Sequence, residues 1–176
     1  MGTDVGTGAA TVDGREPDET PARLRSMPSR LLMHTAMHAD RLVTEGLAGV
    51  DARRWHFAAL VALREYGPAS QSTLSRRTGI YRSDLVAVIN ELAERGYVER
   101  APDPVDRRRN VITLTPQGCR RLRHLDELVT GIQDDLLAPL SEPERDQLVR
   151  LLTRLLDHHA QMAARSAAAQ PRPGEA

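Results

Sequence analysis

Apolar residues recur at intervals of three and four through most of the chain, the spacing that places them on one face of an α-helix. The pattern predicts helices over residues 29–45, 52–66, 71–78, 82–95, 116–138 and 142–164. Between them the period shortens, and Tyr97–Arg100 and Asn110–Leu114 are predicted to form two short strands of a β-hairpin. The expected fold is therefore mainly α with one small hairpin.

Short polar residues stand where several helices should begin. Such side chains accept hydrogen bonds from the free N–H groups of a first helical turn. We assign this N-cap role to Asp51, Ser70, Thr115 and Ser141. Val50 and Trp55 flank the first of these at the spacing of a hydrophobic staple, which favours a core position for Trp55. Gly79 should form a turn, and Gly96 should end the helix before the hairpin in a left-handed conformation.

The central order of helix, short helix, glycine turn, helix and hairpin is typical of a winged helix-turn-helix. In that domain the second helix of the pair enters the DNA major groove and the first crosses the backbone. The loop between the strands, APDPVDRRR, contains the densest basic cluster of the chain. Arginines at such a tip suit a narrow minor groove, whose negative potential attracts them. The pattern thus predicts a protein that binds duplex DNA.

Composition agrees with this prediction once the position of each charge is considered. The formal net charge is zero, but all 24 basic residues are Arg. Arg presents a planar fork that suits phosphates and guanine edges, although GC-rich coding produces the same bias. A local basic patch binds DNA even on a neutral protein.

Several other classes of protein are disfavoured. No apolar run approaches the roughly 20 residues of a membrane helix, and the N-terminus lacks the pattern of a secretory signal, so we expect a cytoplasmic protein. The single cysteine, Cys119, excludes an internal disulfide framework and a cysteine-rich zinc site. We find no nucleophile–base pair, P-loop or metal triad, and therefore expect no enzyme, cofactor or metal.

The stretch ELAERGYVERAPDPVDRRRNVITLTPQG resembles the recognition-helix end, wing and following helix start of MarR-family regulators. The matching residues are Leu92, Gly96, Tyr97, Val98, Asp103, Pro104, Asp106, Arg107, Arg108, Leu114, Thr115 and Gly118. The resemblance extends over about residues 29–163. It implies an obligate dimer built from the first helix and the last two, a DNA-binding lobe on each side, and a ligand cleft where lobe and dimer region meet.

These expectations divide the chain into five segments. Residues 1–27 and 165–176 are predicted to be disordered, because they are polar or small and lack periodicity. Residues 28–50 and 116–164 form the expected helical dimerisation region. The last two helices carry long leucine stripes that need a partner surface, and the resemblance implies that the first helix joins them. Residues 51–115 form the expected winged helix-turn-helix lobe.

The candidate DNA contacts lie on three elements. The recognition helix exposes Arg82, Ser83, Val86 and Asn90. There Asn is suited to adenine, Arg to guanine or phosphate, and Val to a thymine methyl group. The shorter helix offers the phosphate contacts Ser70, Ser72 and Arg76. At the wing, the resemblance implies that Arg108 enters the minor groove and that Asp106 orients the loop, with Arg107 pairing with Asp106 or a phosphate and Arg109 completing the cluster. The alternative for each of these residues taken singly is a solvent-exposed surface position that makes no contact with DNA.

The candidate ligand contacts come from the cleft that the resemblance implies. They are Met37, His38, Arg41, Trp55 and His56. Arg41 would meet an anionic aromatic ligand or an acidic neighbour. His34 and His38 lie one turn apart but lack a third metal ligand, so helix packing is favoured over metal binding. Cys119 is expected to be structural, with a thiol switch as the alternative.

The sequence thus predicts a homodimeric transcriptional repressor that binds a pseudo-palindromic operator and responds to a small aromatic or lipophilic ligand. Half-sites would lie about one helical turn (~34–36 Å) apart. A ligand-independent or activating factor, a redox- or metal-responsive regulator, and a winged-helix module that binds proteins remain alternatives.

Overall fold

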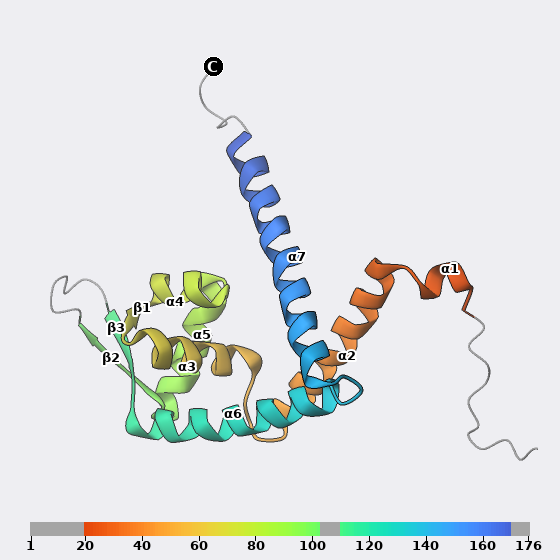
Figure 1. The fold of residues 1–176 in the computed structure, drawn as a ribbon. Coiled ribbons are helices and arrows are strands. Elements are labelled where there is room, and N and C mark those ends of the chain that lie inside the picture. Colours follow the sequence, from red (N-terminus) through yellow and green to blue (C-terminus); the bar gives the residue numbers. More distant parts are fainter. Residues whose placement is uncertain (1–19, 103–109, 170–176) are drawn as a thin grey trace, which may run out of the picture. The chain divides into compact units, whose positions relative to one another are not determined.

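The computed structural model describes residues 20–102 and 110–169, with side chains described as far as residue 166. The chain separates into two compact units, Met1–Ala39 and Asp40–Ala176. Its elements are shown in Figure 1 and are, in chain order, α1 (Ala22–Arg25), α2 (Pro28–Ala48), α3 (Arg54–Tyr66), β1 (Ala69–Ser70), α4 (Gln71–Thr78), α5 (Arg82–Glu94), β2 (Val98–Pro102), β3 (Asn110–Leu114), α6 (Pro116–Leu136) and α7 (Glu142–Ala169).

The first unit contains α1 and the first part of α2. The four-residue helix α1 lies in a stretch where the sequence predicts no regular structure. Helix α2 begins with a proline. Proline has no N–H group, and this costs nothing at the first helical position because an N–H there makes no hydrogen bond within the helix. Leu31, Leu32, Met33 and Met37 are between 43% and 64% exposed. These four apolar side chains are therefore largely exposed in the described part of the chain.

The second unit contains the predicted winged helix-turn-helix. Helices α3, α4 and α5 gather beside a small antiparallel sheet of strand order β1–β3–β2 (Figure 1). Strands β2 and β3 pair from Val98 opposite Leu114 to Pro102 opposite Asn110, which confirms the predicted hairpin. Strand β1 adds two further pairs, including Ala69 opposite Ile112. Two residues carry no period, so the sequence pattern did not predict this strand.

One hydrophobic core holds this lobe together. It is built from one face of each element and comprises Leu47, Ala59, Leu60, Leu63, Leu74, Ile80, Leu85, Val88, Ile89, Leu92, Val98, Ile112, Leu122 and Leu125. The predicted stripe of α5 is wholly buried. Each large side chain buried in this way contributes about 1.5–3 kcal/mol before conformational entropy is counted. Burial of this stripe directs the opposite face of α5 outward.

Two of the four predicted N-caps, Ser70 and Thr115, are confirmed. The Ser70 hydroxyl accepts from the Thr73 N–H at 3.3 Å, and the Thr115 hydroxyl accepts from the Gly118 N–H at 3.0 Å. The Ser141 N–H donates to a Glu144 carboxylate oxygen at 2.8 Å. The Ser141 hydroxyl donates to the same oxygen at 2.6 Å, so only the glutamate half of the predicted capping box is formed before α7.

The fourth predicted N-cap, Asp51, is wrong. Helix α3 begins at Arg54 with Arg53 in the N-cap position, whereas Asp51 has a φ of 52° and its carboxylate binds Arg95. The shift of two residues also removes the predicted staple. Trp55 is 42% exposed, so the prediction that it is a core residue is wrong.

None of the described helices is long and apolar enough to cross a bilayer.

Two glycines on α6 provide a matched test of the packing between this helix and the wing. A Cβ at Gly118 would collide with the carbonyl oxygen of Tyr97, whereas a Cβ at Gly131 would meet nothing within 4 Å. We expect Gly118→Ala to lower the free energy of unfolding by about 1–3 kcal/mol, because the backbone must move. Gly131→Ala should raise it by up to about 1 kcal/mol, because alanine is the better helix former.

Urea denaturation followed by circular dichroism measures both changes. Equal effects of the two substitutions would contradict the close contact between α6 and Tyr97.

Candidate nucleic-acid interface

Helix α5 presents a continuous polar and small-residue face to solvent. Arg82, Ser83, Val86 and Asn90 are all exposed, and Val86 is 45% exposed. Arg82, Val86 and Asn90 follow one another at intervals of four residues and Ser83 lies three residues before Val86, so the four share one side of the helix. The structure thus brings together the four candidate contacts that the sequence predicted on the recognition helix.

Tyr81 stands at the entry to this face. It occupies the N-cap position of α5, makes no capping hydrogen bond and is 80% exposed. The predicted contacts did not include it. The sequence feature that could have identified Tyr81 is an aromatic residue at an N-cap position, where a short polar residue is usual.

The first turn of α4 gathers three hydroxyl groups. The Ser70 hydroxyl lies 2.9 Å from that of Ser72 and 3.1 Å from that of Thr73. Arg76 is exposed farther along the helix, whereas the Arg77 guanidinium stacks on the Tyr66 ring at 4.7 Å. Ser70, Ser72 and Arg76 therefore lie on a single short helix, as predicted.

The wing contributes an additional residue to this region. Arg100 of β2 donates from Nη2 to the Asn90 Oδ1 at 2.6 Å, which links the wing to the recognition helix. The sequence analysis did not select Arg100, because spacing along the chain does not show that a strand residue reaches a helix. Asp106, Arg107, Arg108 and Arg109 lie outside the described residues.

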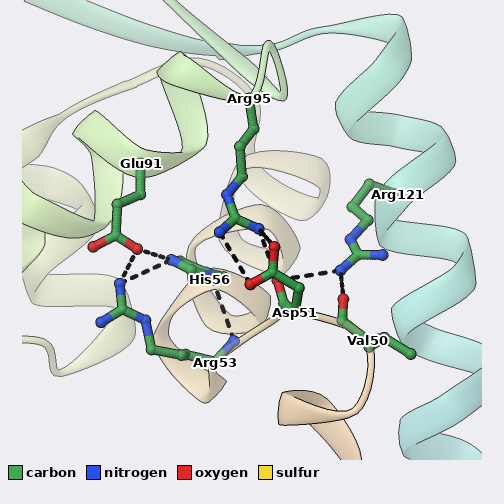
Figure 2. A network of polar contacts seen from close by, with 7 residues as sticks. All are labelled: Val50, Asp51, Arg53, His56, Glu91, Arg95 and Arg121. Carbon is green, nitrogen blue, oxygen red and sulfur yellow. Dashed lines mark hydrogen bonds and ion pairs between the residues drawn. The ribbon is translucent and has the colours of Figure 1, made fainter.

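A polar network holds the C-terminal end of α5 against the loop that follows α2 (Figure 2). The Arg95 guanidinium donates to both carboxylate oxygens of Asp51, at 2.7 and 3.2 Å, and to its carbonyl oxygen at 2.8 Å. From α6, Arg121 donates to the carbonyl oxygen of Val50. The Arg95 guanidinium lowers the pKa of the Asp51 carboxyl. Loop, recognition helix and α6 are therefore joined at one point.

The same end of α5 is also bound to the start of α6. The Thr115 hydroxyl donates to the Gly96 carbonyl oxygen at 2.7 Å, and the Gln117 side chain donates to the Arg95 carbonyl oxygen at 3.3 Å. Gly96 has a φ of 69°, which confirms the predicted left-handed end. These bonds satisfy the carbonyl groups that the last turn of a helix leaves without partners.

His56 is the buried part of this network. Its Nδ1 accepts from the Arg53 N–H at 3.3 Å, so we place the proton on Nε2, which lies 3.0 Å from a Glu91 carboxylate oxygen (Figure 2). Arg53 also pairs with Glu91. Burial, followed by the nearby charges of Arg53 and Arg95, lowers the pKa of His56 to about 4, although Asp51 opposes this shift. His56 is therefore neutral at pH 7.

The five predicted ligand contacts fall in different surroundings. Met37 and His38 belong to the first unit, and Arg41, Trp55 and His56 to the second. Within the second unit, the Trp55 side chain is partly exposed, whereas His56 is only 4% exposed and faces α5.

Beside His56, a small hollow lined in part by Asp51, Arg95, Tyr97 and Arg121 leaves space for about one water molecule. The described residues contain no group of three side chains placed to hold a metal ion.

The buried histidine predicts a pH dependence of stability. Because its pKa is lowered in the folded state, the unfolded chain binds a proton first as the pH falls. The contribution of neutral His56 to stability is thus fully present above pH 6.5 and is lost as the pH falls to about 4. The free energy of unfolding should change by about 3 kcal/mol over this range. Urea denaturation at pH 7.5, 6.0 and 5.0 measures it.

His56→Asn is the comparison, since Asn does not titrate. Its free energy of unfolding should vary less than that of the wild type over this window. The same dependence of the free energy of unfolding on pH in both proteins would contradict the lowered pKa of His56.

The chain is similar to known regulators over both the lobe and the longer helices. The model of the MarR family matches residues 48–109. A protein of Thauera aromatica, named as a regulator of the hcr operon, is 40% identical over 86 residues, which are 49% of this chain and 52% of that protein. The chain thus spans about half the length of this relative. The repressor NicR of Pseudomonas putida is 28% identical over 145 residues, 80% of this chain and 89% of that protein.

Solved structures extend the similarity. A crystal structure of a Pseudomonas aeruginosa protein named as a transcriptional regulator is 33% identical, with a TM-score of 0.67 over 76% of this chain and 99% of that one. Bordetella bronchiseptica BpsR, whose DNA binding is regulated by 6-hydroxynicotinic acid, is 25% identical, with a TM-score of 0.69 over 78% of this chain and 98% of that one. The chain therefore belongs to the MarR family of winged helix-turn-helix transcriptional regulators.

Proposed function

We propose that the chain binds a pseudo-palindromic operator as a homodimer, with α5 in the major groove and the wing in the adjacent minor groove. The observation that carries this proposal is the division of α5 into a buried apolar stripe and an exposed face with Arg82, Ser83 and Asn90. A helix in this position reads base edges with the residues near its N-terminus. Val86 on the same face is suited to the methyl group of thymine.

The surrounding elements would position this helix on the duplex. Ser70, Ser72 and Arg76 of α4 lie on a short helix of the same lobe, and we assign them to phosphate contacts. For the wing, we assign Arg108 to the minor groove, Asp106 to orientation of the loop, and Arg107 and Arg109 to phosphates. Phosphate contacts fix orientation and make affinity fall with salt.

A second copy of the chain is the proposed partner of the remaining helices. On α7 the exposed large apolar residues are Val149, Leu151, Leu155, Leu156 and Met162, with exposures between 45% and 71%. Large apolar side chains exposed in this number on an isolated chain indicate a surface that another protein covers. We therefore retain residues 28–50 and 116–164 as the dimerisation region, with the lobe in residues 51–115.

We further propose that a small aromatic acid weakens the grip on DNA, as 6-hydroxynicotinic acid regulates DNA binding by BpsR. Arg41, Trp55 and His56, with Met37 and His38, remain the proposed contacts. The network around Asp51 and Arg95 links the loop after α2 to the recognition helix, so a ligand that shifts this loop would also shift α5. We propose no catalytic role for the chain, because its relatives are transcriptional regulators.

Charge reversal at the wing tests the proposed interface. The double substitution Arg108→Glu with Arg109→Glu should lower affinity for DNA from the upstream region of its own gene at least about tenfold at low salt, because two cations at the groove become anions. Arg120→Glu with Arg123→Glu, on exposed positions of α6, makes the same change of net charge and is the control. Because both positions lie in the proposed dimerisation region, size-exclusion chromatography first establishes that this variant has the same oligomeric state as the wild type.

Fluorescence anisotropy on labelled duplexes measures both double variants. Equal losses of affinity would show that net charge, and not the wing, governs binding. Failure of the wild-type protein to bind any fragment at low salt would refute the proposal.

Addition of 6-hydroxynicotinate or benzoate tests the ligand class. Either compound should reduce the affinity for DNA. A ligand shifts an equilibrium by the difference between its affinities for the two states, here the state that binds DNA and the state that does not. Cyclohexanecarboxylate has the charge without the aromatic ring and serves as the control. Binding that ignores all three compounds up to millimolar concentration would favour a regulator that does not respond to aromatic acids.

A further inference from the structure

Arg100 reaches the recognition helix from the wing. On β3 its cross-strand partner is Ile112, which is fully buried, and Val98 two residues earlier on β2 is also buried. Directly opposed residues share one face of a sheet, as do residues two apart on one strand. Arg100 therefore lies on the face that packs toward the helices, one step beyond the edge of the core, and its guanidinium meets the side chain of Asn90.

The contact determines how the amide of Asn90 is oriented. A guanidinium has N–H donors and no acceptor, so only the amide oxygen can face Arg100. The donor–acceptor distance of 2.6 Å joins Arg100 Nη2 to Asn90 Oδ1. The Nδ2 group of Asn90 must then point away from Arg100. Asn90 is exposed, so this NH₂ group is available to a ligand on the outer face of α5.

We propose that Arg100 is a specificity-determining residue: it holds Asn90 as a hydrogen-bond donor, so that Asn90 selects guanine over adenine. The inference rests on the proposed entry of α5 into the major groove. It refines the adenine preference that an unrestrained Asn would have.

The base edges supply the chemical reason. An Asn that recognises adenine uses its oxygen and its NH₂ group together, accepting from N6 and donating to N7. Arg100 occupies one of the two lone pairs of Asn90 Oδ1. The adenine amine, itself a donor, would then have to approach the same oxygen beside a positively charged guanidinium donor. Guanine presents two acceptors, N7 and O6, and both suit the outward NH₂ group.

Selection from operator DNA randomised at each position tests the inference with the full-length dimer. Wild-type protein should prefer guanine at one position in each half-site. Arg100→Met removes the donors but keeps an apolar stem, and should shift the guanine-to-adenine ratio at that position toward adenine by about tenfold, the lower range for a bidentate base contact. Arg100→Lys, which keeps a donor and no acceptor, should retain guanine.

Three further variants show which residue reads the base. Asn90→Ala should abolish the preference at this position, and adding Arg100→Met to it should then leave the selected sequence unchanged. Arg76→Met, which removes an exposed arginine from α4, should weaken binding to all sequences without altering the preferred base.

The possible failures are distinguishable. If Arg100→Met lowers affinity equally for all sequences, Arg100 contacts only phosphate and the inference is overturned. Retention of guanine by Arg100→Met overturns it as well, while the proposed function stands. A wild-type protein that selects no sequence overturns both.

Discussion

The arrangement of the DNA-binding lobe depends on the burial of one stripe of α5. Leu85, Val88, Ile89 and Leu92 are at most 4% exposed and pack among side chains from α3, α4, β2 and β3. A helix with a single apolar face can satisfy this core in only one rotational setting. That setting places Arg82, Ser83 and Asn90 on the outside together, because they occupy the remaining positions of the same helical period. The candidate interface is thus a direct consequence of core packing.

Polar contacts then determine where this helix ends and what moves with it. Arg95 binds Asp51 in a bidentate geometry, Arg121 adds a contact to the same loop, and His56 pairs with Glu91 in the last turn of α5 (Figure 2). Charge-assisted bidentate contacts are geometrically specific. A displacement of the loop after α2 would therefore change the orientation of α5 more readily than it would deform the helix. This rigidity provides a physical route from a ligand or a dimer partner to the bases.

The features that the sequence predicted correctly are those that local chemistry decides. The stripe of α5, the caps at Ser70 and Thr115, the contact between Ser141 and Glu144, and the turn at Gly96 all follow from residues within one or two helical turns. Other features depend on partners that are distant in the chain. Asp51 binds an arginine 44 positions away, and this partner outweighs its tendency to cap a helix.

The same limit explains the remaining differences from the predictions. Trp55 is exposed because the helix start moved, and the contact between Arg100 and Asn90 exists only after β2 packs beside α5. The exposure of Arg82, Ser83 and Asn90 on the outer face of α5 was therefore predictable from the helical period. The residue that orients one of them required the tertiary structure.

Affinity cleavage is the most direct test of the claim that the outer face of α5 enters the major groove. An iron chelate can be attached to Ser83→Cys in a Cys119→Ser background, since the chain has a single cysteine. The account predicts two clusters of strand cleavage in the operator major groove, related by symmetry and about one helical turn (~34–36 Å) apart. Uniform cleavage along the bound DNA, or none in a complex that still forms, would contradict it.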